Sequence, residues 1–339
     1  MANQQRIFYA CQAVAIAPRG TSSLTSSHIV EGAQSVGMSS TFTLDQVFEL
    51  GQIEIYENVE EVADIEVNLE KVIDGKKLIY TLASNDACKT DLVAASKERC
   101  DVHVAIFDDG LSHATGVPRN VCYNSGMFIS SVAYNYSVDG TATESVSLVG
   151  NDRFWHKTQA GVIGQAPDTI WGTSSNLVGG AGIDGTDEPV KLVRRVNVNV
   201  AGSIIPGEVA AQQDASNAVG IGSGMHIQSI AVSTDFGQEQ IQELGRFGPY
   251  TRYATFPIEV TCDFEVIATS GDFISVSGDN ANLTNQQIRI KDEAGTVIDL
   301  GGKNKLSSVS YTGGDTGGGN ATITYSYSNF NVLTVNDNV

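Results

Sequence analysis

Residues 34–51 read QSVGMSSTFTLDQVFELG, and residues 228–245 repeat this stretch as QSIAVSTDFGQEQIQELG, without a gap and at a fixed offset of 194. This period is far above the roughly 20–50 residues of solenoid repeats, so it indicates two copies of a whole domain. Two like domains in one chain carry an approximate symmetry element, which usually serves assembly. The identical positions pair Gln34 with Gln228, Ser35 with Ser229, Ser39 with Ser233, Phe42 with Phe236, Gln46 with Gln240, Glu49 with Glu243, Leu50 with Leu244 and Gly51 with Gly245.

The repeat extends beyond this block, and the order of its segments is kept. Ile-Glu-Val occurs at 65–67 and 258–260, and Ser-Ser-Val-x-Tyr occurs at 130–134 and 307–311, now at an offset of 177. The fall from 194 to 177 makes the second copy 17 residues shorter, and we place most of the loss opposite residues 76–102. We predict a first copy over 1–157, a glycine-rich linker over 158–190 and a second copy over 191–339.

Composition favours a folded, β-rich protein. The chain has 339 residues, 41% of them hydrophobic, which is enough for two domains that each have a core. Its 35 glycines, together with abundant Ser, Thr, Val and Asn, are typical of strands joined by many turns. The net charge of −19 argues against ordinary binding to a nucleic-acid backbone. The fold class that we predict is therefore mainly β.

Cysteine usage and the N-terminus predict reduced thiols in a cytosolic compartment. The five cysteines are an odd number and are not shared between the copies, so a repeated disulfide framework is not expected. The apolar run at 7–17 loosely resembles a signal peptide, but Gln12 interrupts it and a single basic residue, Arg6, precedes it. No apolar stretch of about 18 residues occurs, so we expect no membrane span.

Two equivalent segments alternate between apolar and polar residues. Ile65, Val67 and Leu69 alternate with acidic and amide side chains, and the apolar residues of 258–266 alternate in the same way. This period of two predicts strands with one buried face and one wet, acidic face. A slip of one residue would bury the carboxylates, so the register of both strands is fixed.

Each copy also contains a predicted hairpin. In the first copy it joins residues 128–136 to 143–149, through a turn near Asp139-Gly140. In the second copy it joins 306–311 to 321–327 through a glycine-rich turn. The hairpins carry the Ser-Ser-Val-x-Tyr segments, so they belong to the repeated fold.

Helical patterns are scarce. Residues 88–99 predict a helix of about three turns, with an acidic residue early and basic residues late, as the helix dipole prefers. A short helix over 43–50 or 237–244 is a second expectation, with Gly51 or Gly245 as its C-terminal cap.

Motifs of catalysis and of cofactor or metal binding are lacking or lie in the wrong context. Residues 180–185 match G-x-G-x-x-G, but Pro189 follows where a helix should begin, so we interpret them as a linker turn. The run 313–320 is interpreted as a lengthened hairpin turn. No His or Cys pair has metal-ligand spacing, and no G-x-S-x-G motif occurs. We predict no enzyme activity, no cofactor and no metal.

The segment 42–75, FTLDQVFELGQIEIYENVEEVADIEVNLEKVIDG, resembles the tail tube proteins of bacteriophages, as does the later hairpin followed by SVSLVGNDRFW at 145–155. The second copy keeps the repeated block, the strand and the hairpin, but departs around 248–256. The resemblance implies two tandem tail-tube-type β-sandwich domains with a short helix, whose inner strands join sideways into a closed multi-chain barrel. Three chains, or six, would form a ring, and rings would stack into a tube.

From this resemblance we expect a structural protein of the virion, assembled in the host cytoplasm, that polymerises with itself and contacts baseplate, terminator or sheath proteins. DNA would pass through the tube, and carboxylates suit its lumen because they repel phosphates. The expected lumen-facing residues are Asp64, Glu66, Glu70, Glu259, Asp263 and Glu265. The expected ring-stacking residues are Glu54, Glu57, Glu60, Glu61, Arg246 and Arg252.

Several alternatives stay open on the sequence alone. The acidic faces could lie outside in solvent, and the second copy could decorate the exterior of a ring of six chains. A tail-end or baseplate adaptor of the same fold would form one ring and no polymer. A pair of carbohydrate-binding β-sandwiches, as in a fibre or adhesin, is the remaining class.

Overall fold

The computed structural model describes residues 6–21, 24–109, 118–157, 192–213, 224–276, 283–314 and 319–337. The described chain is mainly β, with one large antiparallel sheet, three small sheets and short helices, which confirms the predicted fold class. The predicted linker 158–190, with its G-x-G-x-x-G segment, lies outside the described residues, and so does part of the turn 313–320.

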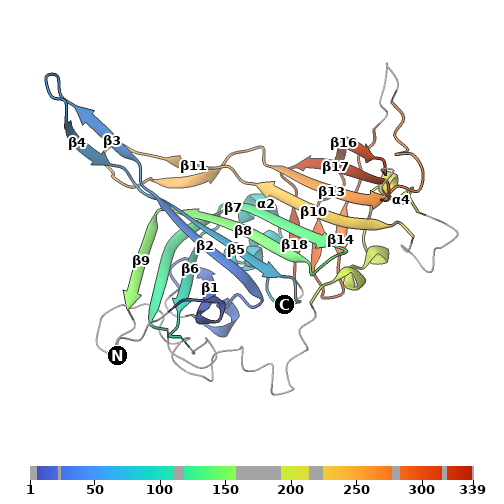
Figure 1. Cartoon of the computed structure of the whole chain (residues 1–339), viewed down its shortest axis with the longest axis horizontal. Helices are drawn as coiled ribbons and strands as arrows, with labels where there is room; N and C mark the ends of the chain where they lie inside the picture. Colours follow the sequence, from blue (N-terminus) through green and yellow to red (C-terminus); the bar gives the residue numbers. More distant parts are fainter. Residues whose placement is uncertain are drawn as a thin grey trace.

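Eight strands follow one another across the large sheet in the order β2-β5-β8-β7-β10-β13-β17-β16 (Figure 1). The first four come from the first copy and the last four from the second, and equivalent strands occupy equivalent places. The two sets therefore follow each other head to tail. Their bounds are β2 Ala33–Thr41, β5 Asp64–Val72, β8 Thr143–Gly150, β7 Asn120–Ser137, β10 Ile227–Asp235, β13 Glu259–Ile267, β17 Thr322–Phe330 and β16 Lys305–Thr312.

The two sets agree even in their irregularities. β2 shifts register after Ala33 and β10 shifts after Ile227, which is the same position at the offset of 194. β7 shifts after Ile129 and β16 shifts after Leu306, again the same position at the offset of 177. Because a bulge inserts one unpaired residue at a defined place, its recurrence establishes these strand equivalences residue by residue.

The strand equivalence between β5 and β13 differs from the sequence match. Ser35 pairs with Glu70 and Ser229 pairs with Glu265, so the structural offset is 195 and the Ile-Glu-Val match at 193 is wrong by two residues. A shift of two residues leaves every side chain on its original face. With either alignment, the acidic residues of both strands therefore lie on the exposed face.

One seam joins the two copies within the chain. β7 pairs with β10 from Ser137 opposite Ser229 to Ser131 opposite Asp235. The expectation of one core per copy is wrong, because apolar side chains from Val14 to Val335 form a single cluster, with a small second cluster beside it. The continuous sheet is the physical reason, since it gives both copies one shared apolar face.

Further strands form the other layers of the molecule. The N-terminal half of β7 pairs with β6 and β9, which branch from the eight-strand path of the large sheet, and its C-terminal half pairs with β8 and β10 within that path. Gly126, with a φ of +64°, lies between these halves. The remaining bounds in these layers are β1 Gln12–Pro18, β6 Cys100–Ile106 and β9 Asp152–Lys157 in the first copy, and β14 Arg289–Lys291, β15 Val297–Asp299 and β18 Thr334–Asn336 in the second.

Both helix predictions need correction. The expected helix over 88–99 is broken into η3 and α2, because the Asp91 carboxylate accepts a hydrogen bond from the Ala94 N–H and starts a separate helix. The expected helix over 43–50 or 237–244 is wrong, since both segments form hairpin strands. The helical segments are η1 Tyr9–Cys11, η2 Ser26–His28, α1 Ile79–Ala83, η3 Ala87–Lys89, α2 Leu92–Ala95, η5 Arg195–Asn197, η6 Val200–Gly202 and α4 Gly207–Ala210.

Candidate assembly surfaces

One face of the large sheet carries the six acidic residues that we expected to line a lumen. Their sequence neighbours, including Val67, Val260 and Phe264, are buried on the opposite face. The antiparallel register places the acidic side chains of both copies on the same side of one sheet. This acidic face consists of Asp64, Glu66, Glu70, Glu259, Asp263 and Glu265, all exposed or half-exposed.

Serines accompany these carboxylates. The Ser35 hydroxyl donates to Glu70 at 3.4 Å, and the equivalent Ser229 hydroxyl donates to Glu265 at 3.2 Å. Neither of these hydrogen bonds neutralises a glutamate carboxylate, so the face keeps its negative potential.

Basic residues are almost absent from the eight strands. They contain Lys71, which is buried on the core side, and Lys305, which is exposed. Asp235 adds one more exposed carboxylate at the end of β10. Sequence comparison missed Asp235 because its counterpart in the first copy is Thr41.

Arg252 of the second copy contacts Asp64 of the first copy. The Arg252 guanidinium forms an ion pair with Asp64, and the Gln240 amide also donates to that carboxylate. Arg252 is only 7% exposed, and its Nε donates to Asn151 Oδ1 at 3.3 Å. The charge of Asp64 is therefore compensated within the chain, and a predicted stacking residue holds the two copies together.

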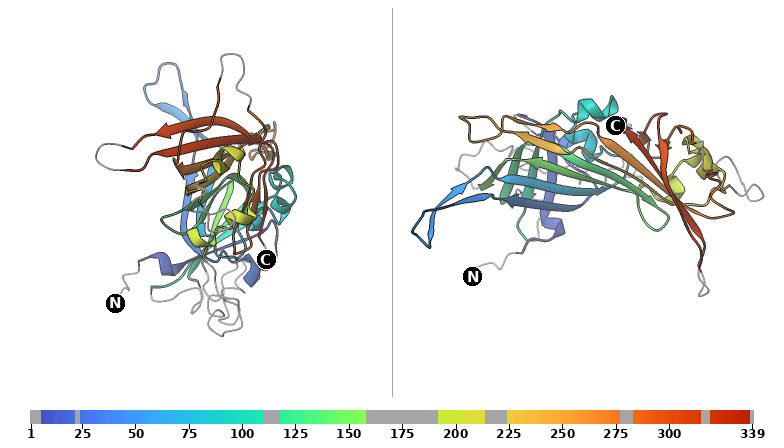
Figure 2. Two further views of the ribbon diagram at one scale, coloured as in Figure 1. Left: turned by 90° about the vertical axis from the view of Figure 1, so that its right-hand side faces the viewer. Right: turned by 90° about the horizontal axis from the view of Figure 1, so that it is seen from above.

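A long hairpin projects beyond the large sheet (Figures 1 and 2). Its strands are β3, Leu44–Phe48, and β4, Ile55–Glu60, and every residue in them is exposed. Leu50 and Ile53 at its tip are fully exposed. A two-stranded hairpin with exposed apolar side chains is marginally stable alone and indicates an interaction surface. Four predicted stacking residues lie on or beside this β3–β4 hairpin: Glu54, Glu57, Glu60 and Glu61.

A shorter, equivalent hairpin belongs to the second copy. It consists of β11, Gln238–Ile241, and β12, Thr251–Ala254. The Gln238 amide donates to the Ile129 carbonyl at 2.9 Å, so this hairpin is fastened to the first copy. The two turns explain the mistaken helix caps, because Gly51 and Gly245 have φ of +96° and +85° in hairpin turns.

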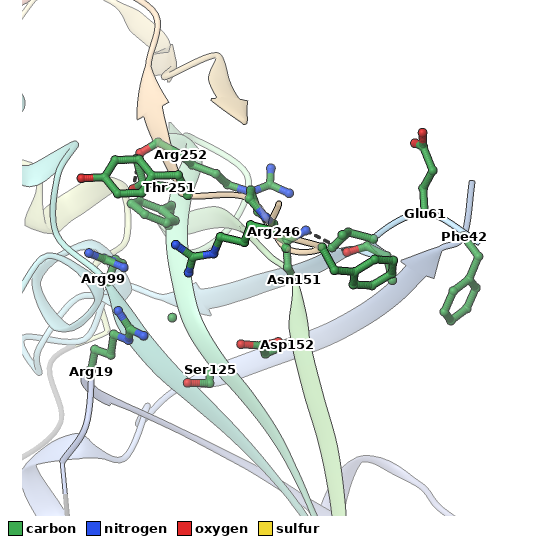
Figure 3. A pocket seen from close by; sticks show the side chains of 18 of the residues that line it. Arg19, Phe42, Glu61, Arg99, Ser125, Asn151, Asp152, Arg246, Thr251 and Arg252 are labelled. Carbon is green, nitrogen blue, oxygen red and sulfur yellow. Dashed lines mark hydrogen bonds between the residues drawn. The ribbon is translucent and has the colours of Figure 1, made fainter. Parts of the chain in front are cut away.

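A groove of about 660 Å³ lies between the base of the β3–β4 hairpin and the turn of the β11–β12 hairpin (Figure 3). Four arginines line it, and we call it the arginine groove. Arg99 lies over the Phe128 ring at 5.4 Å, and Arg19 comes from the end of β1. No local pattern marks Arg19 and Arg99, because tertiary packing alone brings them here. The charged lining residues are Arg19, Arg99, Arg246 and Arg252, with Glu60, Glu61 and Asp152.

Within the described ranges no three His, Cys, Asp or Glu side chains gather in a way that would hold a metal ion. The five cysteines are buried free thiols, and burial raises the pKa of the Cys88 thiol to about 11. No helix in the described part of the chain is long and apolar enough to cross a membrane.

Comparisons with known proteins give matches at the level of solved structures. No protein-family model and no curated protein matches the chain. The anti-feeding prophage baseplate matches with a TM-score of 0.32 at 12% identity, covering 45% of this chain and 97% of that chain. The tube-terminating cap of the same prophage matches at 0.35 and 12% identity, covering 47% and 95%. The sheath–tube complex of an extracellular contractile injection system matches at 0.33 and 12% identity, covering 46% and 95%. A similarity this low assigns no function by itself.

Proposed function

We propose that this chain is a structural protein of a tail-like particle, forming rings that stack into a hollow tube for DNA. The head-to-tail order of the large sheet carries the proposal. β7 ends the first set of strands and pairs with β10, which begins the second set. The open edges of the chain, β16 and β2, are the equivalents of these two strands. An interface of this kind repeats from chain to chain, and it forms a ring when the rotation between chains closes.

Ring closure also solves a physical problem of the single chain. Two open sheet edges expose unpaired N–H and C=O groups and invite aggregation, and a closed ring of strands removes both. Three chains would supply six sets of four strands. Three is the number that we favour, because each chain already contributes two equivalent sets.

Stacking between rings is assigned to the hairpins and the arginine groove. Residues 42–61 contain six acidic residues and no basic one. Within the arginine groove Arg252 is paired with Asp64, so we assign the contact with the acidic β3–β4 hairpin of the next ring to Arg19, Arg99 and Arg246. The exposed apolar side chains of the hairpin would gain burial in the same contact.

Electron microscopy of the purified protein tests this function. We expect hollow tubes from the wild-type chain and isolated rings from the Glu54→Lys/Glu57→Lys variant, because these residues lie on the projecting hairpin and not in the chain's own groove, and like charges would then oppose at the groove of the next ring. The Glu54→Gln/Glu57→Gln variant is the matched control and keeps tubes. Wild-type single rings would identify an adaptor, and monomers at high concentration would contradict the proposal. Tubes from the lysine variant would contradict the assigned stacking contact.

A second prediction concerns the acidic face. Glu66→Lys/Asp263→Lys raises the net charge by four units per chain, at two carboxylates that form no hydrogen bond with the described residues. Tubes of this variant, assembled with short duplex DNA, should retain nuclease-protected DNA at low salt and release it as salt rises. Glu66→Gln/Asp263→Asn is the neutral control and should retain at least tenfold less. DNA that is bound but digested by nuclease would place this face outside the tube.

A further inference from the structure

We propose that β16 of one chain pairs with β2 of the next chain in a single defined register, with Ser310 opposite Ser39 and Tyr311 opposite Met38. The occupant of each open edge is thus a second copy of this chain. The inference rests on the proposed ring, and it adds the atomic register of its interface.

The register follows from the seam that the chain already contains. In that seam Tyr134 of β7 lies opposite Val232 of β10, and Ala133 lies opposite Ser233. The recurring bulges make β16 equivalent to β7 at an offset of 177 and β2 equivalent to β10 at an offset of 194. Applying both offsets to the seam gives the pairs Ser308–Thr41, Val309–Ser40, Ser310–Ser39, Tyr311–Met38 and Thr312–Gly37.

The exposure of side chains at the open edges independently supports a neighbouring chain at this place. Tyr134 is 1% exposed beside the seam, whereas its equivalent Tyr311 is 56% exposed at the open edge. Phe236 is 0% exposed, whereas its equivalent Phe42 is 69% exposed. Tyr311 on β16 and Phe42, directly after β2, are thus exposed at positions whose equivalents beside the seam are buried. Burial of these side chains by a neighbouring chain would favour association, because it removes apolar surface from water.

Backbone hydrogen bonds define which pairs lie closest. The Phe236 N–H donates to Ser130 O at 2.8 Å, and the Val138 N–H donates to Gln228 O at 3.0 Å. Hydrogen-bonded and non-hydrogen-bonded pairs alternate, so Ala133 and Ser233 form a non-hydrogen-bonded pair. Ser310 and Ser39 inherit this geometry, in which the Cβ atoms approach to about 4.5–5.5 Å and a disulfide is accessible.

The test is a cross-link between Ser39→Cys and Ser310→Cys in one chain. These positions lie at opposite ends of the eight-strand path, roughly 33 Å apart at the usual strand spacing, so a bridge can form only between chains. The native cysteines are all buried and contribute little background. After assembly under reducing conditions and mild oxidation, non-reducing electrophoresis should show a ladder that ends at the closed ring, which is three chains if our stoichiometry holds.

The control moves one cysteine by two residues on the same face. In Gly37→Cys/Ser310→Cys the new Cβ meets no atom closer than 3.8 Å, so the fold tolerates it. We expect at least tenfold less cross-linking from this pair. Equal or greater cross-linking of the shifted pair would overturn the register, as would rings in the microscope without any bridge between residues 39 and 310. If the wild-type chain forms no rings, the proposed function is wrong, and the register that rests on it is wrong as well.

Discussion

Tyr311→Pro should abolish ring formation while leaving the single chain folded. By equivalence with Tyr134, the Tyr311 N–H points away from β17 and toward the neighbouring chain. Proline removes that donor, and its ring occupies the space that the next strand would enter. Proline is tolerated on an edge strand when the lost N–H faces outward, so the fold of the chain is spared.

The expected size of this effect is large because a ring contains several copies of the seam. Loss of one seam hydrogen bond and one buried aromatic side chain costs at least about 1.4 kcal/mol, which is tenfold in the association constant. If the three seams between chains in a ring weaken independently, the equilibrium constant for ring formation falls about a thousandfold. Sedimentation velocity and electron microscopy on the same sample measure this change.

Tyr311→Ala is the matched control. It removes the same side chain but keeps the N–H, so rings should persist with reduced stability. Circular dichroism and thermal unfolding verify that both variants retain the fold of the wild-type monomer. Wild-type levels of rings from folded Tyr311→Pro would show that the β16 edge takes no part in assembly.

Glu144→Ala should lower the free energy of unfolding by about 3–5 kcal/mol. Glu144 lies on the core side of β8 and is fully buried. Its carboxylate accepts hydrogen bonds from the Ile79 N–H at 2.6 Å, the Tyr80 N–H at 3.0 Å and the Tyr134 hydroxyl at 3.1 Å. Truncation leaves these donors without that acceptor and opens a cavity beside α1.

The control for this change is the next residue along the same strand. Ser145 points to the exposed face, so Ser145→Ala should change stability by no more than about 0.5 kcal/mol. Chemical denaturation of both variants gives the comparison. A cost of less than about 1 kcal/mol for Glu144→Ala would mean that the α1 N-terminus finds another acceptor.

The pH dependence of Glu144→Gln separates charge from packing. Burial raises the pKa of Glu144 above its usual 4.5, although Lys71 and the backbone N–H donors oppose this shift. The native state therefore holds the proton more tightly than the unfolded state, and this contribution to stability is lost as pH rises through the native pKa. The destabilisation caused by Glu144→Gln should be greatest below pH 4.5 and smaller above the native pKa. A deficit that grows with pH would contradict this sign.

Much of the local structure was predictable from the sequence. Alternation along 64–70 and 258–266 placed the acidic side chains on one face, and that face survived a two-residue correction of the alignment. The helix α1 was missed because Ile79–Ala83 is a short, wholly buried apolar run, which shows no helical period. The strands of the β3–β4 hairpin were mistaken for a helix because Gly51 suits a hairpin turn as well as a helix cap.

Alternation, duplication and bulge positions are local properties, because each depends on the side-chain period of a strand or on the match between two segments. The pairing of β7 with β10, the single core and the contact of Asp64 with Arg252 are different in kind. They join residues far apart in the sequence, 188 positions for Asp64 and Arg252, and no local pattern encodes which strand an open edge accepts. A strand edge presents the same N–H and C=O groups to any partner, so only three-dimensional packing selects the neighbour. That selection, made once inside the chain, specifies the register that we expect between chains.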